Sequence, residues 1–393
     1  MAGRDREYRD DYDEFEYADD TEERSARSRG RRSSSASGTR AAKKKAGKKR
    51  GKILLFVVEI IVLIVMLVVL YAVTRGTENV AKVNIKEEDI IINEEVKISE
   101  ETGEMKGYRN IALFGVDSRT GSLTKNTRSD TIIIASVNLD TGDIKLCSVY
   151  RDTYLNLSND TYNKCNAAYA KGGPEQAMNM LNLNLDMNIT DFVTIGFEGL
   201  SKVIDALGGV EIDVDSAEID HLNNYQYTMA EDLQVSYTKV EHTGMQNLNG
   251  LQATAYCRIR YTAGDDFKRA ERQREVLKAV MDKAKQADVA TLTKAVNSIF
   301  DAKLVYTSLG LDEILELLKD VGKYRVASDD GFPQADMRDT GTIGGGVGSS
   351  VIPLDLYNNV IWLHKYLFGD ENYTPSADVK RCSEKVAGTS YKK

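Results

Sequence analysis

The run "ILLFVVEIIVLIVMLVVLYAV" at residues 53–73 is 21 residues long and contains one charged side chain, Glu59. An apolar run of this length crosses a lipid bilayer as a helix. The basic run "KKKAGKKRGK" precedes it, and the sequence that follows is mixed in charge. Because positive charge collects on the cytoplasmic side of a span, we expect a single-pass protein of the cell membrane, with a cytoplasmic N-terminus and about 320 extracellular residues. A cleaved signal peptide fits less well, since its apolar core is shorter and an A-x-A-like site follows it.

Charge is distributed unevenly along the chain. Residues 25–52 contain twelve Lys or Arg and no acid, whereas the residues after 52 contain 36 Lys or Arg and 49 Asp or Glu. Residues 1–52 have little to bury, so we expect a disordered cytoplasmic tail, first acidic and then basic beside the membrane. The acidic balance of the exported part argues against nucleic acid as a partner.

Cysteine and histidine show no metal-binding pattern. The four cysteines form no C-x-x-C pair and the three histidines form no H-E-x-x-H motif, so zinc is not expected. A disulfide is an alternative in an exported chain. The apolar surroundings of Cys147, Cys165 and Cys257 favour unpaired, buried thiols instead.

The sequence after the apolar run divides into three parts. Residues 74–105 are charged and predict an extracellular stalk. In residues 106–325, β-rich runs such as "RNIALFGVD" and "DFVTIGF" alternate with helical patterns, which predicts an α/β fold, specifically an α/β/α sandwich around a central mixed sheet. Residues 326–393 form a C-terminal extension, in which we expect "GTIGGGVGSSVIP" to be a flexible loop because it lacks the G-K-[ST] ending of a phosphate loop.

The stretch "YCRIRYTAGDDFKRAERQREVL" concentrates arginine in an acidic chain. If "YCRIRY" is extended, Arg258 and Arg260 lie on the same face of a strand. A turn then leads into a helix on which Arg269, Arg272 and Gln273 share one face. Guanidinium groups near a helix N-terminus suit an oxygen-rich dianion such as a pyrophosphate. A salt-bridged helix face explains the helix arginines equally well, but it does not explain the pair on the strand.

Two aspartates predict a metal site. Asp117 ends one strand and Asp130 begins the next, so neighbouring strands would bring both carboxylates to one edge of the sheet. Two carboxylates that leave room for water and phosphate oxygens suit Mg²⁺. Loop carboxylates paired with Arg119, Arg128 and Arg151 are the alternative.

These motifs resemble those of the LytR-CpsA-Psr family of Gram-positive envelope proteins. The likeness runs continuously over residues 109–285 and includes "NIALFGVDSR", "RSDTIIIASVN", "SVYRDTYL", "NAAYAKGG" and "CRIRYTAGDDFKRAERQ", in the family's order and spacing. The resemblance implies an enzyme that takes a glycopolymer, such as teichoic acid or capsular polysaccharide, from undecaprenyl pyrophosphate. The polymer goes to a peptidoglycan sugar hydroxyl, and undecaprenyl phosphate is released.

The resemblance also implies roles for individual residues. It makes Asp117 and Asp130 the ligands of Mg²⁺, or of Mn²⁺ as a substitute, and it counts both as catalytic together with Arg128, Arg258 and Arg260. The implied pyrophosphate-binding residues are Arg128, Arg151, Arg258, Arg260, Arg269 and Gln273. The implied supporting residues are Arg119, Lys164, Asn166, Asp266 and Arg272. The family fold further implies a long apolar tunnel for the polyprenyl chain.

Two other functions remain open at this point. A polyprenyl-pyrophosphate pyrophosphatase would use the same residues, with water in place of the sugar hydroxyl. A non-enzymatic envelope or transcriptional regulator is the third reading, although the cytoplasmic part contains no DNA-binding motif.

Overall fold

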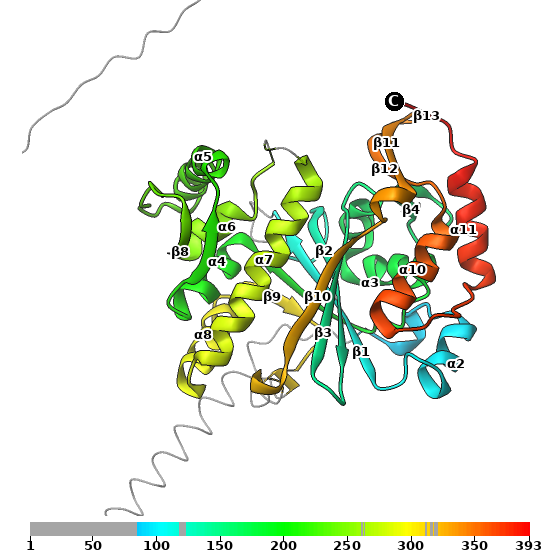
Figure 1. Cartoon of the computed structure of the whole chain (residues 1–393), viewed down its shortest axis with the longest axis horizontal. Helices are drawn as coiled ribbons and strands as arrows, with labels where there is room; N and C mark the ends of the chain where they lie inside the picture. The colour runs from blue at the N-terminus through cyan, green and yellow to red at the C-terminus, as the bar shows by residue number, and fades with distance from the viewer. Residues whose placement is uncertain are drawn as a thin grey trace, which may run out of the picture. The chain divides into compact units, whose positions relative to one another are not determined.

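A six-stranded sheet forms the centre of the fold, in the order β10-β3-β2-β1-β6-β9 (Figure 1). The computed structural model describes residues 85–117, 123–260, 262, 264–310, 313–314, 317 and 321–393. The strands of this sheet are β1 (Tyr108–Val116), β2 (Ser129–Asn138), β3 (Asp143–Val149), β6 (Asp191–Gly196), β9 (Val305–Thr307) and β10 (Arg325–Phe332). β1 pairs antiparallel with β2 and parallel with β6, and β10 pairs parallel with β3. The predicted mixed sheet of an α/β fold is therefore confirmed.

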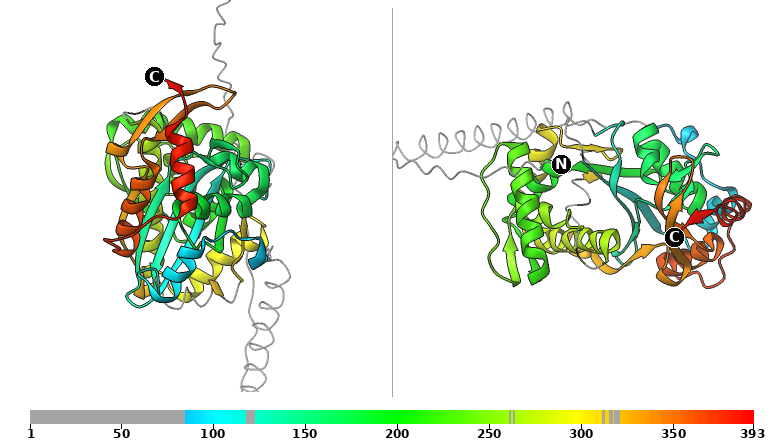
Figure 2. Two further views of the ribbon diagram at one scale, coloured as in Figure 1. Left: turned by 90° about the vertical axis from the view of Figure 1, so that its right-hand side faces the viewer. Right: turned by 90° about the horizontal axis from the view of Figure 1, so that it is seen from above.

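Helices cover both faces of the sheet, as the view from above shows (Figure 2). One face carries α2 (Glu94–Thr102), α3 (Asn166–Leu185), α10 (Leu356–Phe368) and α11 (Ala377–Ala387), and the other carries α4 (Phe197–Ala206), α7 (Asp265–Gln286) and α8 (Val289–Asp301). Successive residues of a strand point to opposite faces. Ile132 and Ile134 accordingly pack against α3, whereas Ile133 packs against Leu277 of α7.

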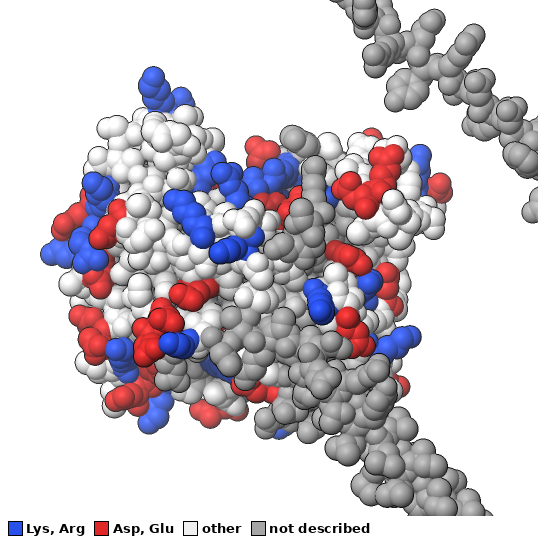
Figure 3. Space-filling view, turned by 180° about the vertical axis from the view of Figure 1, so that it is seen from behind, with Lys and Arg blue, Asp and Glu red and all other residues white. Residues whose placement is uncertain are grey.

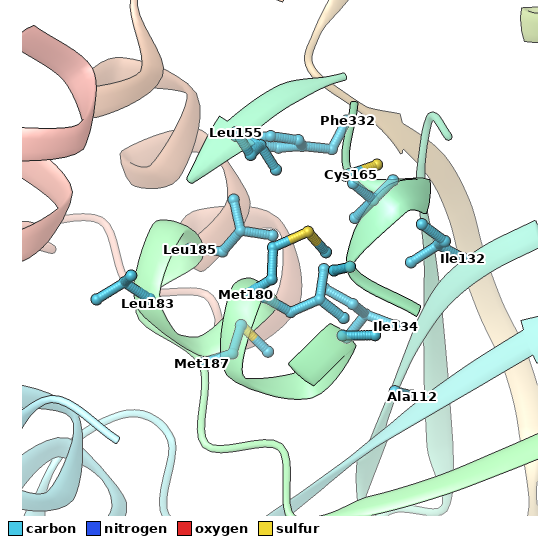
Figure 4. Packing of buried hydrophobic residues seen from close by; sticks show 14 of the residues in the cluster. Ala112, Ile132, Ile134, Leu155, Cys165, Met180, Leu183, Leu185, Met187 and Phe332 are labelled. Atoms are coloured by element: carbon cyan, nitrogen blue, oxygen red, sulfur yellow. The ribbon is translucent and has the colours of Figure 1, made fainter. Parts of the chain in front are cut away.

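The largest core lies between the sheet and α3. Figure 4 shows Met180 and Leu185 of α3 beside Ile134 of β2 and Phe332 of β10. The same core contains Leu363 of α10 and other apolar residues of α10 and α11. The predicted boundary at residue 326 falls inside β10, and the residues after it share the core of the residues before it.

All four cysteines are buried and unpaired, as expected.

Smaller elements complete the described part of the chain. They are β4 (Tyr154–Asn156), β5 (Tyr162–Lys164), β7 (Val210–Val214), α5 (Ser216–Leu233), β8 (Gly244–Leu248), α6 (Gly250–Tyr256), β11 (Arg338–Ile343), β12 (Gly348–Pro353) and β13 (Tyr391–Lys392), with short 3-10 helices at Glu87–Asp89, Val321–Lys323 and Ala335–Met337. The prediction of a flexible loop at "GTIGGGVGSSVIP" was wrong, because β11 and β12 pair there as an antiparallel hairpin. Gly345, Gly346 and Gly348 adopt positive φ angles, which lets the chain turn tightly between the two strands.

The predicted membrane span and cytoplasmic tail lie outside the described residues, as does the first part of the predicted stalk. Within the described residues no helix has the length and apolar character needed to cross a bilayer. The later part of the stalk forms α2, whose Val96 is fully buried in the core. Figure 3 shows one face of the domain, on which acidic and basic side chains are interspersed.

Candidate pyrophosphate site

Two carboxylates lie where β1 and β2 meet. Asp117 directly follows β1, and Asp130 is the second residue of β2. Because the two strands are antiparallel neighbours, with Val116 opposite Ser129, both aspartates reach the same edge of the sheet, as predicted. Both side chains line one cavity of about 360 Å³.

The segment that carries Arg258 and Arg260 is not a strand, so that prediction was wrong. Tyr256 ends α6, and Arg258 N and Ile259 N continue with turn hydrogen bonds to the carbonyls of Ala255 and Tyr256. Asn249 and Gln252 form a capping box that starts α6, which favours a helix over an extended chain. The coiled chain nevertheless brings both arginines into the cavity lining.

Asp266 sits among three arginines at the start of α7. Its carboxylate lies 3.2 Å from Arg151 Nε, 3.5 Å from Arg260 Nε and 3.4 Å from Arg269 Nη2. Burial opposes ionisation of Asp266, but Arg269, Arg151 and Arg260 outweigh it, so the pKa of this carboxyl lies below its ordinary value. Asp266 is therefore ionised and forms ion pairs that hold the three arginines close together.

Arg151 connects Asp266 and its arginines with Asp130, one of the two predicted metal ligands. Its Nη1 lies 2.5 Å from Asp130 Oδ1, and Arg260 Nη2 lies 3.9 Å from Asp130 Oδ2. Asp130 therefore pairs with arginines that come from two distant parts of the chain.

Arg269 is almost completely buried beside two other cationic side chains, those of Arg151 and Arg260. Its side chain is 5% exposed, and its Nε has no hydrogen-bond partner. Burial, followed by repulsion from Arg151, lowers the pKa of Arg269 to about 10 although Asp266 acts in the opposite direction. An additional anion would stabilise a buried guanidinium that has an unused donor and cationic neighbours.

Arg258 lies on an aromatic cradle. Its guanidinium carbon is 4.4 Å from the centre of the Phe197 ring and 5.4 Å from that of Tyr225, and its Nη2 is 3.4 Å from Asp117 Oδ2. Sequence reasoning connected neither aromatic residue with Arg258, because only these contacts distinguish the two rings from ordinary core residues. Gln273 also lines the cavity and donates from Nε2 to the Cys257 carbonyl at 3.4 Å.

The rest of the cavity is apolar. The sheet supplies Val193 and Ile195 from the "DFVTIGF" run, and helices supply Leu200, Val203, Val276, Leu277, Val280 and Ile299. A cavity that is lined by charged side chains and by a larger set of apolar ones suits a ligand with a charged head and a hydrocarbon chain.

The remaining predicted residues lie apart from the cavity. Arg128 is described and exposed but does not line it, and Arg119 lies outside the described residues. Arg272 is buried and directed toward Glu218. Lys164 pairs with Asp152 at 3.4 Å, and Asn166 is buried with its backbone N bonded to the Arg151 carbonyl. Sequence reasoning passed over Asp152, although it directly follows Arg151.

The fit of the site to a magnesium ion rests on Asp117 and Asp130. Within the described residues no group of three or more His, Cys, Asp or Glu side chains is arranged to hold a metal. Two carboxylates that open into the same cavity do fit Mg²⁺, which is commonly held by one or two carboxylates together with substrate phosphate oxygens.

Comparison with known proteins shows the family of the chain. The model of the LytR_cpsA_psr family matches residues 67–331. The chain belongs to the LytR-CpsA-Psr family. It is 32% identical over 218 residues to the polyisoprenyl-teichoic acid–peptidoglycan teichoic acid transferase TagU of Oceanobacillus iheyensis, which covers 53% of this chain and 61% of the relative.

The chain is also similar to a relative whose name describes a regulator. Biofilm regulatory protein A of Streptococcus mutans is 30% identical over 237 residues, which covers 55% of this chain and 56% of that protein. The chain thus spans about three fifths of the length of these curated relatives. The crystal structure of TagV from B. subtilis is 26% identical, with a TM-score of 0.52, and the alignment covers 69% of this chain and 99% of that one.

Proposed function

We propose that the protein transfers a glycopolymer, such as teichoic acid or capsular polysaccharide, from undecaprenyl pyrophosphate to a sugar hydroxyl of peptidoglycan. The observation that carries the proposal is that Arg258, Arg260 and Arg269 line the same cavity of about 360 Å³ as a set of apolar side chains. A lipid-linked pyrophosphate has the same division into a dianionic head and an apolar chain. The names of the teichoic acid transferase relatives support the same reaction class.

The arginines of the site would act on the pyrophosphate by electrostatic stabilisation. The acceptor hydroxyl oxygen attacks the phosphorus that carries the polymer, and the bond from that phosphorus to the bridging oxygen breaks. Undecaprenyl phosphate leaves with the bonding electrons, and the hydroxyl proton passes to a base or to water. Arg151, Arg260 and Arg269 would bind the oxygens on which charge increases, and such preorganised contacts are usually the largest contribution to catalysis.

Asp117 and Asp130 would hold a magnesium ion, with Mn²⁺ as a substitute. A divalent ion supplies Lewis-acid stabilisation to phosphoryl oxygens. Arg258 would hold Asp117 in place from its aromatic cradle, and Arg151 would do the same for Asp130. Asp266, ionised and shared among three arginines, serves to position them.

The membrane is part of the proposal. We propose that residues 53–73 anchor the chain and that the domain acts outside the cell, where both its lipid-linked donor and peptidoglycan are found. The apolar part of the cavity would hold the polyprenyl chain, while the pyrophosphate would bind at the arginines that line the same cavity.

The test uses the full-length chain in detergent or nanodiscs. It receives Mg²⁺, a lipid-pyrophosphate-linked oligosaccharide with labelled sugar and a peptidoglycan fragment. Transfer predicts label on peptidoglycan, whereas release of labelled oligosaccharide phosphate would favour a pyrophosphatase. Absence of both products with several carriers would favour a non-enzymatic regulator.

Variants connect that outcome to the site. Arg258→Ala and Asp130→Ala should each lower the rate by a factor on the order of 10² to 10³. Arg325→Ala serves as the control, because Arg325 is an exposed arginine paired with Asp143 at the far end of β10. Full activity in both site variants would show that the site is elsewhere.

A further inference from the structure

The β11–β12 hairpin lies after the family match, which ends at residue 331. It nevertheless lies beside the site residues Arg151, Asp266 and Arg269. Val351 N of β12 donates to the Asp152 carbonyl at 2.9 Å, and Val351 forms a β-bridge with Thr153. Val351 is buried together with Tyr150 and Ala270, and Phe267 packs against them. We call these four residues the hairpin cluster.

Arg338, the first residue of β11, covers the hairpin cluster. Its guanidinium carbon lies 3.8 Å from the centre of the Phe267 ring and 4.8 Å from that of Tyr150. The two rings meet edge to face with centroids 4.6 Å apart. Arg338 Nη1 donates to the Pro333 carbonyl at 2.7 Å, which fixes the guanidinium in this position.

Three members of the hairpin cluster are each adjacent in sequence to a site residue. Tyr150 precedes Arg151, Phe267 follows Asp266, and Ala270 follows Arg269. These site residues form the ion pairs in which Asp266 joins Arg151 and Arg269. The backbone segments that carry the two rings are therefore the same segments that carry the ion pairs.

Val351 also lies beside the site residues. Together with Asp130, Arg151, Asp266 and Arg269 it lines a second cavity of about 20 Å³, enough for one water molecule. The hairpin thus limits the space into which the arginines can move.

We propose that Arg338 is a positioning residue, which stacks on Phe267 and Tyr150 and thereby holds Arg151, Asp266 and Arg269 in the geometry that binds a pyrophosphate. The inference rests on the proposed function for its ligand. It assigns a role to the C-terminal part of the chain, where the sequence predicts only an extension.

The physical basis is a stacked guanidinium. A planar guanidinium over an aromatic face gains both cation–π and stacking contact, whereas a lysine ammonium keeps the cation–π attraction but loses the planar stacking. Loss of the guanidinium also removes the hydrogen bond by which Arg338, at the start of β11, contacts the Pro333 carbonyl just after β10.

The experiment measures magnesium pyrophosphate binding by the full-length chain in detergent, using calorimetry, so that no turnover is needed. Arg338→Ala should weaken binding about tenfold, and Arg338→Lys should recover part of the loss. Arg325→Ala, which removes an exposed arginine from β10, should bind like the wild type. Hydrogen exchange should rise at residues 264–270 in Arg338→Ala.

The outcomes separate this inference from the proposed function. Binding that weakens in Arg338→Ala but not in Arg325→Ala, at equal melting temperature, supports the positioning role even where no transfer activity is found. Unchanged binding and unchanged exchange in Arg338→Ala overturn it. A lower melting temperature with unchanged pyrophosphate affinity in both Arg338 variants also overturns it, because the contact is then only structural. If the wild type binds no pyrophosphate, the exchange at residues 264–270 decides alone.

Discussion

Arg272 Nε lies 2.7 Å from Glu218 Oε1, and the two side chains are only 1% and 6% exposed. The other donors of Arg272 reach the Ile259 carbonyl at 3.1 Å and Thr262 Oγ1 at 2.7 Å. Ile259 stands between Arg258 and Arg260. Arg272, held by this buried ion pair, therefore stabilises the non-strand segment that carries Arg258 and Arg260.

We predict that stability and function separate in a double-mutant cycle on this pair. Arg272→Leu leaves a buried carboxylate unpaired and should lower the free energy of unfolding by about 3 to 5 kcal/mol. Glu218→Leu should do the same, and it also removes the carboxylate that accepts a hydrogen bond from Asp215 N in the capping box. The double variant should be less destabilised than the sum of the singles, as chemical denaturation would show.

The double variant should still bind magnesium pyrophosphate poorly, because Ile259 and Thr262 have lost their donor. Wild-type affinity in the double variant would mean that the pair contributes to stability alone.

A second prediction concerns Arg269, whose charge is buried and repelled by Arg151. Arg269→Met removes this repulsion, so the melting temperature without ligand should stay the same or rise. The wild type should gain stability from added magnesium pyrophosphate by mass action, and the variant should gain far less. Differential scanning fluorimetry with and without ligand measures both effects. An equal ligand-induced shift in the two proteins would remove Arg269 from the binding site.

A third prediction tests the apolar cavity. Val280 of α7 lines it, whereas Val289 at the start of α8 is 72% exposed. Val280→Phe should fill part of the cavity and weaken binding of a long polyprenyl pyrophosphate, while binding of inorganic pyrophosphate stays unchanged. Val289→Phe adds the same volume outside the cavity and should change neither. Competition binding with the two ligands makes the comparison, and equal losses for both would show that the cavity does not hold the chain.

The alternating pattern of the chain predicted the central sheet well. Apolar β-rich runs bounded by turns led to β1, β2 and β6, since their periodicity is a local property. The meeting of Asp117 and Asp130 followed directly, because consecutive strands that form a hairpin place adjoining ends together.

Contacts between distant segments were not predictable in the same way. Local β-propensity favoured a strand at "YCRIRY", but the capping box of α6 and the hydrogen bond from Arg272 to Ile259 override it. Arg338 carries no sequence signal for its position over Phe267. That contact depends on the addition of β10 to the edge of the sheet, which brings β11 to the start of α7.

A fourth prediction concerns the pH dependence of stability. His364 of α10 is fully buried, stacks on Tyr373 with ring centroids 3.5 Å apart, and its Nε2 lies 3.0 Å from the Leu185 carbonyl. Burial lowers the pKa of His364 to about 4, against the effects of the Leu185 carbonyl and of Asp370. Between pH 6.5, the ordinary pKa, and about 4 the unfolded chain binds a proton that the folded chain does not.

The stability that neutral His364 contributes is therefore complete above about pH 6.5 and falls as the pH decreases toward 4, by about 3 kcal/mol in total. His364→Gln retains a donor for the Leu185 carbonyl and cannot be protonated, so its unfolding free energy should fall less steeply over this range. His242→Gln alters an exposed histidine and should follow the wild type. Urea titrations at pH 7.5, 6 and 4.5 give the three slopes. Parallel curves for the wild type and His364→Gln would show that protonation of His364 does not contribute to acid unfolding, and that other groups buried in the core are responsible.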